Sequence, residues 1–140
     1  MRKKNPWFDY ALDDFKAIEV LLNEKVYRLA CFHAQQFVEK VFKGLLFQQG
    51  IDPPRTHDLG FLYQKLEQLN LLLKIDMPDL EFLSDVYLEF RYPPDIGLLP
   101  HGEPMEEDAL KALEIAQRIF AQVDCEPAKG SRGNLMFLLC

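Results

Sequence analysis

Residues 26–50, VYRLACFHAQQFVEKVFKGLLFQQG, are the most informative stretch of this chain. The apolar residues recur at intervals of three and four, a spacing that places side chains on one face of an α-helix. On such a helix the apolar face consists of Ala30, Ala34, Val38, Val41 and Leu45. Gly50, followed by a pair of prolines, favours an end to the helix at about Gln49. The stretch therefore predicts one long helix that begins at about Val26.

The same helical spacing continues on both sides of this stretch, and no useful length of strand-like alternation occurs. We expect an earlier helix with Asn5 as its N-cap and Pro6 at its first position. Three later helices are expected, one after Thr56, one capped by Asp76 and one opened by Pro104. The pattern predicts an all-α protein, an up-and-down bundle of about five helices with short connections.

The length and composition fit one small globular domain. The chain has 140 residues, of which 49% are apolar, so it can bury a core without a metal or a disulfide. We expect the bundle to span residues 1–123. Residues 124–140 contain Pro, Gly and Ser and are expected to form a flexible C-terminal tail. A net charge of −6 disfavours a general nucleic-acid coat, which neutralises phosphates with many cations.

The cysteines, histidines and apolar runs bear on localisation and cofactors. The cysteines are odd in number and form no CxxC pair, which favours reduced thiols over a disulfide framework. The apolar runs fall far short of the ~20 residues of a membrane span. We therefore expect a cytoplasmic protein without a membrane partner. The histidines lie far apart in the sequence, so we expect no metal site and no cofactor.

Polar side chains form two groups on the helix predicted over residues 26–49. One polar arc consists of Arg28, Gln35, Glu39 and Lys43. A second line, formed by His33, Gln36 and Lys40, falls between that arc and the apolar face. A donor-rich line beside an apolar face indicates a cleft or a subunit interface. The structural alternative is a boundary stripe in which a neighbouring helix holds the histidine.

A second polar cluster ends the predicted fourth helix. Phe90-Arg91-Tyr92-Pro93-Pro94-Asp95 is followed in the loop by His101. Arginine offers a planar fork for phosphate, and tyrosine offers a flat face for a base. Arg91 near the C-terminus of a helix also interacts favourably with the helix dipole, so a structural role explains it as well.

A third cluster, Thr56-His57-Asp58-Leu59, opens the predicted third helix. Thr56 is suited to cap this helix and Asp58 to occupy its first turn. Capping does not require His57, whose side chain is left for another role.

Together these motifs resemble those of the HEPN family, the higher eukaryotes and prokaryotes nucleotide-binding domain. The matching pieces are Trp7-x-x-x-Ala11-x-x-Asp14, Phe32-His33-Ala34-Gln35-Gln36-x-x-Glu39-Lys40, Thr56-His57-Asp58-Leu59 and Arg91-Tyr92-Pro93. The resemblance covers about residues 5–123. It implies a small bundle, usually homodimeric, that often works beside a minimal nucleotidyltransferase, frequently as a toxin–antitoxin pair. It also implies a fold related to the helical domain of kanamycin nucleotidyltransferase.

The first hypothesis that the resemblance implies is a nucleotide- or RNA-binding homodimer with a nucleotidyltransferase partner. Arg91 and Lys40 would hold phosphate, and Tyr92 would stack on a base. The residues expected at this binding site are His33, Gln36, Lys40, His57, Asp58, Arg91, Tyr92 and Asp95.

A separate branch of the family implies a second hypothesis, a metal-independent endoribonuclease with an Arg-x4-6-His signature. The expected catalytic residues are Arg91 and His101, with His101 or His57 as the base for a ribose 2′-hydroxyl. Residues 92–100 separate Arg91 from His101, which is more than the signature has. A third hypothesis is a non-catalytic interaction scaffold, in which the polar residues stabilise a dimer.

Overall fold

The computed structural model describes residues 4–71, 73–91 and 102–123, which form five α-helices and contain no strand. The helices are α1 (Pro6–Asn23), α2 (Tyr27–Gln48), α3 (Leu59–Gln68), α4 (Met77–Arg91) and α5 (Glu106–Phe120). The all-α bundle predicted from the sequence is therefore confirmed. The tail expected over residues 124–140 lies outside the described residues. Among the described helices, none combines the length and the apolarity needed to cross a membrane.

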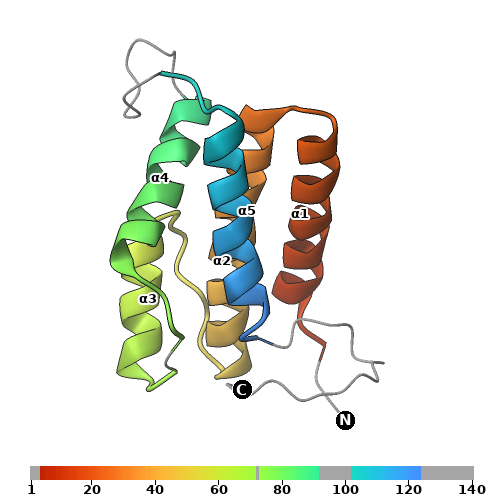
Figure 1. The fold of residues 1–140 in the computed structure, drawn as a ribbon. Coiled ribbons are helices and arrows are strands. Elements are labelled where there is room, and N and C mark those ends of the chain that lie inside the picture. The colour runs from red at the N-terminus through yellow and green to blue at the C-terminus, as the bar shows by residue number, and fades with distance from the viewer. Residues whose placement is uncertain (1–3, 72, 92–101, 124–140) are drawn as a thin grey trace.

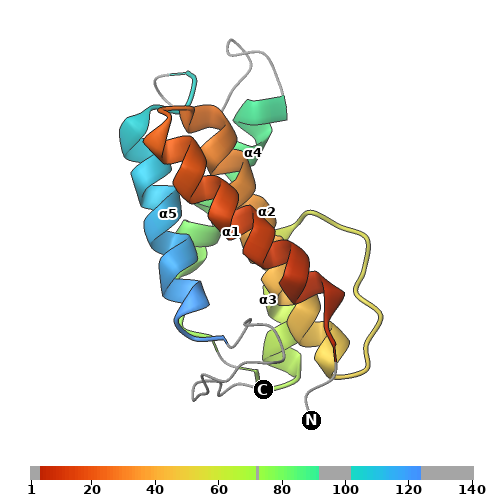
Figure 2. The same cartoon turned by 90° about the vertical axis from the view of Figure 1, so that its right-hand side faces the viewer.

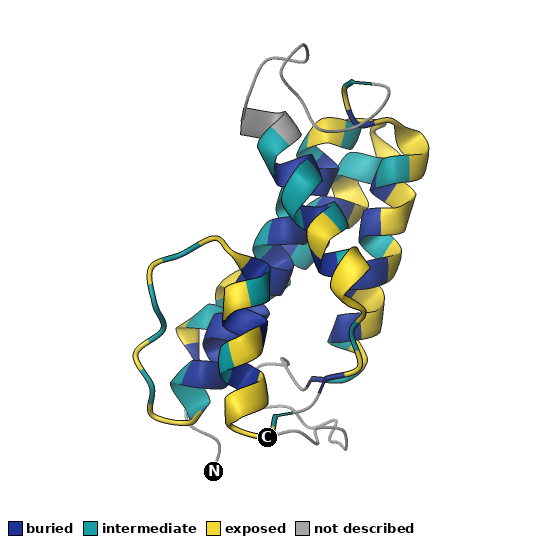
Figure 3. Cartoon of the chain, turned by 90° about the vertical axis from the view of Figure 1, so that its left-hand side faces the viewer, coloured by how far each residue is buried: buried dark blue, intermediate teal, exposed yellow. Residues whose placement is uncertain are grey.

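α2 is the central helix, because it contacts each of the other four. Figure 1 shows α1 on one side of α2, α3 and α4 on the other side, and α5 in front. Figure 2, turned by a quarter, shows α1 lying along α2 for most of its length. Phe37, Phe42 and Leu46 on α2 are completely buried. In Figure 3 the buried positions follow the inward faces of the helices and the exposed positions follow the outer faces.

The start of α1 is fixed by Asn5, as the sequence predicts. The Asn5 Oδ1 atom accepts a hydrogen bond from the Trp7 backbone N–H at 3.1 Å, and Pro6 occupies the first turn. The other end of the same amide reaches α2, where Asn5 Nδ2 donates to the Gly44 carbonyl at 3.0 Å. This one side chain therefore caps α1 and ties it to α2.

The connection between α2 and α3 runs back in the direction opposite to α2 before α3 begins (Figure 1). Its end is tied to the middle of α2, because Gln35 Nε2 donates to the His57 carbonyl at 3.2 Å. The observed N-cap of α3 is Asp58, whose Oδ1 accepts from the Phe61 N–H at 3.1 Å. Thr56, the expected cap, instead accepts from the Asp58 N–H at 3.0 Å. Its hydroxyl stabilises the turn before the helix, so the helix begins later than expected.

α5 also begins slightly later than expected from Pro104. The Met105 N–H donates to Asp108 Oδ2 at 2.8 Å, and the helix starts at Glu106. Asp108 therefore satisfies a backbone donor at the N-terminus that would otherwise lack a partner within the helix. The acidic first turn, which includes Glu106 and Glu107, lies at the positive end of the helix dipole, as predicted.

Candidate functional site

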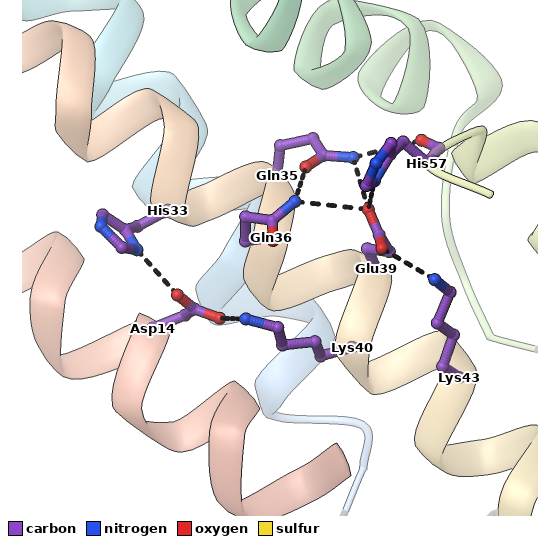
Figure 4. Close-up of polar contacts among 8 residues, drawn as sticks. All are labelled: Asp14, His33, Gln35, Gln36, Glu39, Lys40, Lys43 and His57. Carbon is purple, nitrogen blue, oxygen red and sulfur yellow. Dashed lines mark hydrogen bonds and ion pairs between the residues drawn. The ribbon is translucent and has the colours of Figure 1, made fainter. Parts of the chain in front are cut away.

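Two buried carboxylates, Asp14 on α1 and Glu39 on α2, contact the polar side chains of α2 (Figure 4). Their side chains are only 8% and 5% exposed, respectively. A buried charge is costly unless it is paired and hydrogen-bonded. Each of these carboxylates has one histidine and one lysine as partners. The site is therefore built on two buried anions with partners of the same kinds.

Asp14 joins α1 to the line of polar residues on α2. His33 Nδ1 lies 2.7 Å from Asp14 Oδ1, and Lys40 Nζ lies 2.7 Å from Asp14 Oδ2. His33 and Lys40 are two turns apart on α2, so one carboxylate between them reaches both. Their side chains remain 26% and 24% exposed. A neighbouring helix therefore holds the histidine, as the structural alternative predicts, while both side chains stay partly exposed.

Glu39 gathers a larger set of donors. Its Oε1 atom lies 2.9 Å from His57 Nδ1 and 3.3 Å from the Nε2 atoms of both Gln35 and Gln36. Its Oε2 atom accepts from Lys43 Nζ at 2.9 Å. The predicted polar arc is therefore buried at Gln35, Glu39 and Lys43. Arg28, its fourth expected member, is exposed and pairs instead with Glu103 at 3.6 Å.

The two carboxylates determine which nitrogen of each histidine carries the proton. A carboxylate only accepts hydrogen bonds, so the Nδ1 atoms of His33 and His57 must donate to Asp14 and Glu39. In the neutral imidazole the other nitrogen, Nε2, is then the acceptor. His57, with its side chain 58% exposed, presents this acceptor nitrogen at the surface. The arrangement is chemically suited to accept a hydrogen bond or a proton.

Aromatic rings connect this site to the end of α4. The Tyr87 ring lies 5.4 Å from the His57 ring and 5.7 Å from the Phe32 ring, with which it is stacked. Arg91 ends α4 one helical turn after Tyr87. The backbone at the end of α4 is therefore held on the same side of the bundle as His57.

The structure brings together four of the predicted site residues: His33, Gln36, Lys40 and His57 (Figure 4). Asp58 is nearby in the sequence, but its carboxylate caps α3. The Arg91 side chain and the whole of Tyr92, Asp95 and His101 lie outside the described residues.

Sequence reasoning did not assign Asp14 and Glu39 to the site, although both are its anchors. The available signal was the position of Asp14 on the inward face of α1, between the buried residues Ala11 and Ile18. A carboxylate on an apolar stripe predicts a partner on the facing helix. Glu39 gave the same signal less clearly, because the sequence groups it with other polar side chains.

Cys31 on α2 is not a candidate nucleophile. Burial, with a smaller contribution from the Asp108 carboxylate, raises the pKa of its thiol from the ordinary 9.0 to about 12. The thiol therefore stays protonated, and the thiolate is the reactive form. Among the described residues, no group of three or more histidine, cysteine or acidic side chains is arranged to hold a metal ion.

Comparisons with known proteins identify the family of this chain. The HEPN domain model matches residues 5–126. The crystal structure of TT1696 from Thermus thermophilus is similar with a TM-score of 0.67 and 26% identity, covering 81% of this chain and 90% of that chain. ST0689, an archaeal HEPN homologue, is similar with a TM-score of 0.57 and 27% identity, covering 84% of this chain and 93% of that chain. No curated protein matches this sequence.

Proposed function

The chain belongs to the HEPN domain family, and we propose that it binds a nucleotide or RNA at the line of His33, Gln36 and Lys40 together with the adjoining His57. The observation that carries the proposal is the pairing of His33 and Lys40 with the two oxygens of Asp14, while both side chains remain partly exposed. Groups that are already held in place lose little conformational freedom when a ligand binds. The line is therefore suited to recognition.

In this proposal the residues have different roles. Lys40 and Arg91 hold phosphate, and Tyr92 stacks on a base. His33, Gln36 and His57 provide polar contacts. Asp58 acts through the first turn of α3, which it caps, and Asp95 belongs to the segment that follows Tyr92.

A direct test is titration of the full chain with adenosine monophosphate and with a short fluorescent single-stranded RNA. Lys40→Gln retains a donor for Asp14 but removes the charge. We expect it to weaken binding by about tenfold, the loss of one charge-assisted contact. Lys16→Gln, at an exposed position of α1, is the matched control and should bind as the wild type does. The proposal is wrong if neither ligand binds the wild-type protein.

A second candidate function, a metal-independent endoribonuclease, is favoured by the geometry of His57. Its Nδ1 atom lies 2.9 Å from Glu39, so Nε2 is the basic nitrogen on an exposed ring. Arg91, one turn beyond Tyr87, would stabilise the phosphate. Incubation with RNA in EDTA tests this candidate. Cleavage that is lost in both His57→Ala and Arg91→Ala would support it, and intact RNA with the wild-type protein would contradict it.

A homodimer and a minimal nucleotidyltransferase partner of the toxin–antitoxin type belong to the same proposal. Their support is the family membership. Sedimentation of the purified chain measures its mass, and co-expression with a nucleotidyltransferase encoded next to it tests the partner. A complex with that partner, without binding or cleavage of RNA, would favour the scaffold hypothesis instead. The relation to kanamycin nucleotidyltransferase and the cytoplasmic location stay predictions.

A further inference from the structure

The hydrogen bonds around Glu39 determine how both glutamine amides are oriented. Gln35 Nε2 faces Glu39 Oε1 at 3.3 Å and the His57 carbonyl at 3.2 Å, and both partners only accept. The amide nitrogen of Gln35 must therefore occupy this position, with its oxygen turned toward Gln36. Gln36 Nε2 donates to that oxygen at 2.8 Å and to Glu39 Oε1 at 3.3 Å. Both donors of the Gln36 amide are thus used inside the protein.

The Gln36 oxygen is the end of this amide that these hydrogen bonds leave unused. In the part of the chain that the structure describes, the one buried side-chain oxygen or nitrogen without a partner is Gln48 Oε1. The Gln36 oxygen, which has no partner in this network, is therefore at least partly accessible to solvent. An amide oxygen accepts hydrogen bonds and cannot donate them.

The two histidines follow the same pattern. The Nδ1–H groups of His33 and His57 point inward, to Asp14 and Glu39, and leave Nε2 as the acceptor. His33 and Gln36 are three residues apart and are neighbours on the surface of α2. Gln36 and His57 bind the same oxygen of Glu39. The acceptor atoms that these inward hydrogen bonds leave are His33 Nε2, Gln36 Oε1 and His57 Nε2, which we call the acceptor strip; Figure 4 shows the three side chains. The sequence indicates a donor-rich line, but the buried carboxylates turn its donors inward.

We infer that the acceptor strip recognises hydrogen-bond donors of a nucleoside, either its ribose hydroxyls or the exocyclic amino group of its base. This inference rests on the proposed function and specifies its ligand contacts. A row of hydrogen-bond acceptors finds no donor on phosphate oxygens, so in this inference phosphate is bound by cationic groups elsewhere at the site. A ligand that lacks the matching donor leaves the strip unsatisfied, which is the strongest basis for discrimination at a polar site.

The first experiment tests the strip without any ligand. Two-dimensional ¹H–¹⁵N NMR of the histidine rings, at about pH 8 and so above the ordinary titration range of imidazole, distinguishes the two tautomers. We expect His33 and His57 to carry the proton on Nδ1, and His33→Gln and His57→Gln assign the signals. A proton on Nε2 in both rings would turn the strip into donors and overturn the inference, whatever the protein binds.

The second experiment compares four probes: adenosine monophosphate, its 2′,3′-dideoxy analogue, purine riboside monophosphate, which lacks the amino group, and inorganic phosphate. We expect adenosine monophosphate to bind and one of the two nucleotide analogues to bind about tenfold or more weakly. Loss with the dideoxy analogue identifies ribose, and loss with purine riboside identifies the amino group. If both analogues bind as well as adenosine monophosphate, the inference is wrong and the proposed function stands. If none of the nucleotides binds, the inference is wrong, and the proposed function is wrong as well only if the fluorescent RNA does not bind either.

Gln36→Leu tests whether the acceptor strip discriminates between adenosine monophosphate and its analogues, because it removes the Gln36 acceptor. This variant should bind adenosine monophosphate no better than the wild type binds the weaker analogue. Gln64→Leu, at an exposed position of α3, is the matched control. His57→Ala removes a more exposed acceptor and serves as a second test if Gln36→Leu does not fold. Full discrimination by both strip variants would contradict the inference.

Discussion

At the scale of single residues, Asp14 and Glu39 hold the polar groups of the site in place. Each is a carboxylate with little exposure, and each accepts from one lysine and one histidine. A buried charge lowers stability unless its partners are present, so removal of one partner should lower the free energy of unfolding. The two carboxylates therefore couple the stability of the bundle to the geometry of the site.

We predict that Asp14→Asn lowers the free energy of unfolding by about 2 kcal/mol. This value lies below the roughly 3–5 kcal/mol of a fully buried pair that loses one partner, because His33 and Lys40 are each about a quarter exposed. Urea denaturation measures the change. The double variant with Asp14→Asn and Lys40→Gln should lose clearly less free energy of unfolding than the sum of the losses of the two single variants.

The control for Asp14 is the more exposed pair of Asp79 and Arg118, whose atoms are 3.0 Å apart and whose side chains are 15% and 46% exposed. Asp79→Asn should cost less than about 1 kcal/mol, as surface ion pairs do. Equal losses for Asp14→Asn and Asp79→Asn would contradict the view that Asp14 is a buried anchor.

The sequence allowed part of this residue geometry to be predicted. Lys40 and His33 stood out because they share a line on a helix whose period is known. Their common partner Asp14 did not stand out, because it is on another helix. The sequence of one helix does not specify where a second helix crosses it. Glu39 and His57 meet only because the chain climbs back along α2 after Gln48. No local pattern of residues specifies such a path.

At the scale of elements, α1 packs tightly against α2 at Gly44. A Cβ atom on Gly44 would lie 2.4 Å from Cε1 of the buried Phe8 ring, a distance that real contacts do not tolerate. The Gly44 carbonyl also accepts from Asn5 at the start of α1. Gly44 is therefore required for the distance between the helices, although glycine disfavours the helix itself.

We predict that Gly44→Ala destabilises the protein by about 1–3 kcal/mol, the usual cost of overpacking. This loss opposes the gain of up to about 1 kcal/mol that alanine brings to a helix interior. Gly60→Ala is the control, because a Cβ there would meet ordinary contacts of 3.5 Å and 3.6 Å. Thermal unfolding should show a lower midpoint for Gly44→Ala and an unchanged or higher one for Gly60→Ala. A stabilised Gly44→Ala would show that Phe8 moves aside at no cost.

The helices themselves were predictable because their signals are local. The Asn5-Pro6 pair marks the start of α1 in the sequence, and the structure has the cap at that position. The first residues of α3 and α5 are less predictable, because several neighbouring residues can begin a helix. Asp58 rather than Thr56 caps α3, and α5 begins after Met105, whose N–H donates to Asp108, rather than at Pro104.

At the scale of the whole molecule, the central position of α2 places a thiol in the core. Cys31 is completely buried, and burial raises the pKa of its thiol to about 12 from the ordinary 9.0. In the unfolded chain the thiol loses its proton as the pH passes 9.0, whereas in the folded chain it keeps the proton until about pH 12. Above pH 9.0 the unfolded state therefore binds fewer protons than the folded state, so stability falls as the pH rises.

We predict that this thiol makes the folded protein sensitive to alkali. Its contribution to stability is fully present below pH 9.0 and is lost at about 1.4 kcal/mol per pH unit between that value and the folded pKa of about 12. Cys31→Ala should be somewhat less stable at neutral pH, because it leaves a small cavity. Above pH 9.0 its free energy of unfolding should fall less steeply than that of the wild type. Burial also raises the pKa of Tyr63, but both proteins contain Tyr63, so its effect is removed by the comparison.

Urea denaturation of the wild type and of Cys31→Ala from pH 8 to about pH 10.5 measures how steeply each free energy of unfolding falls with pH. Parallel curves would mean that the Cys31 thiol ionises in the folded protein as readily as in the unfolded chain, and that the core around α2 admits water.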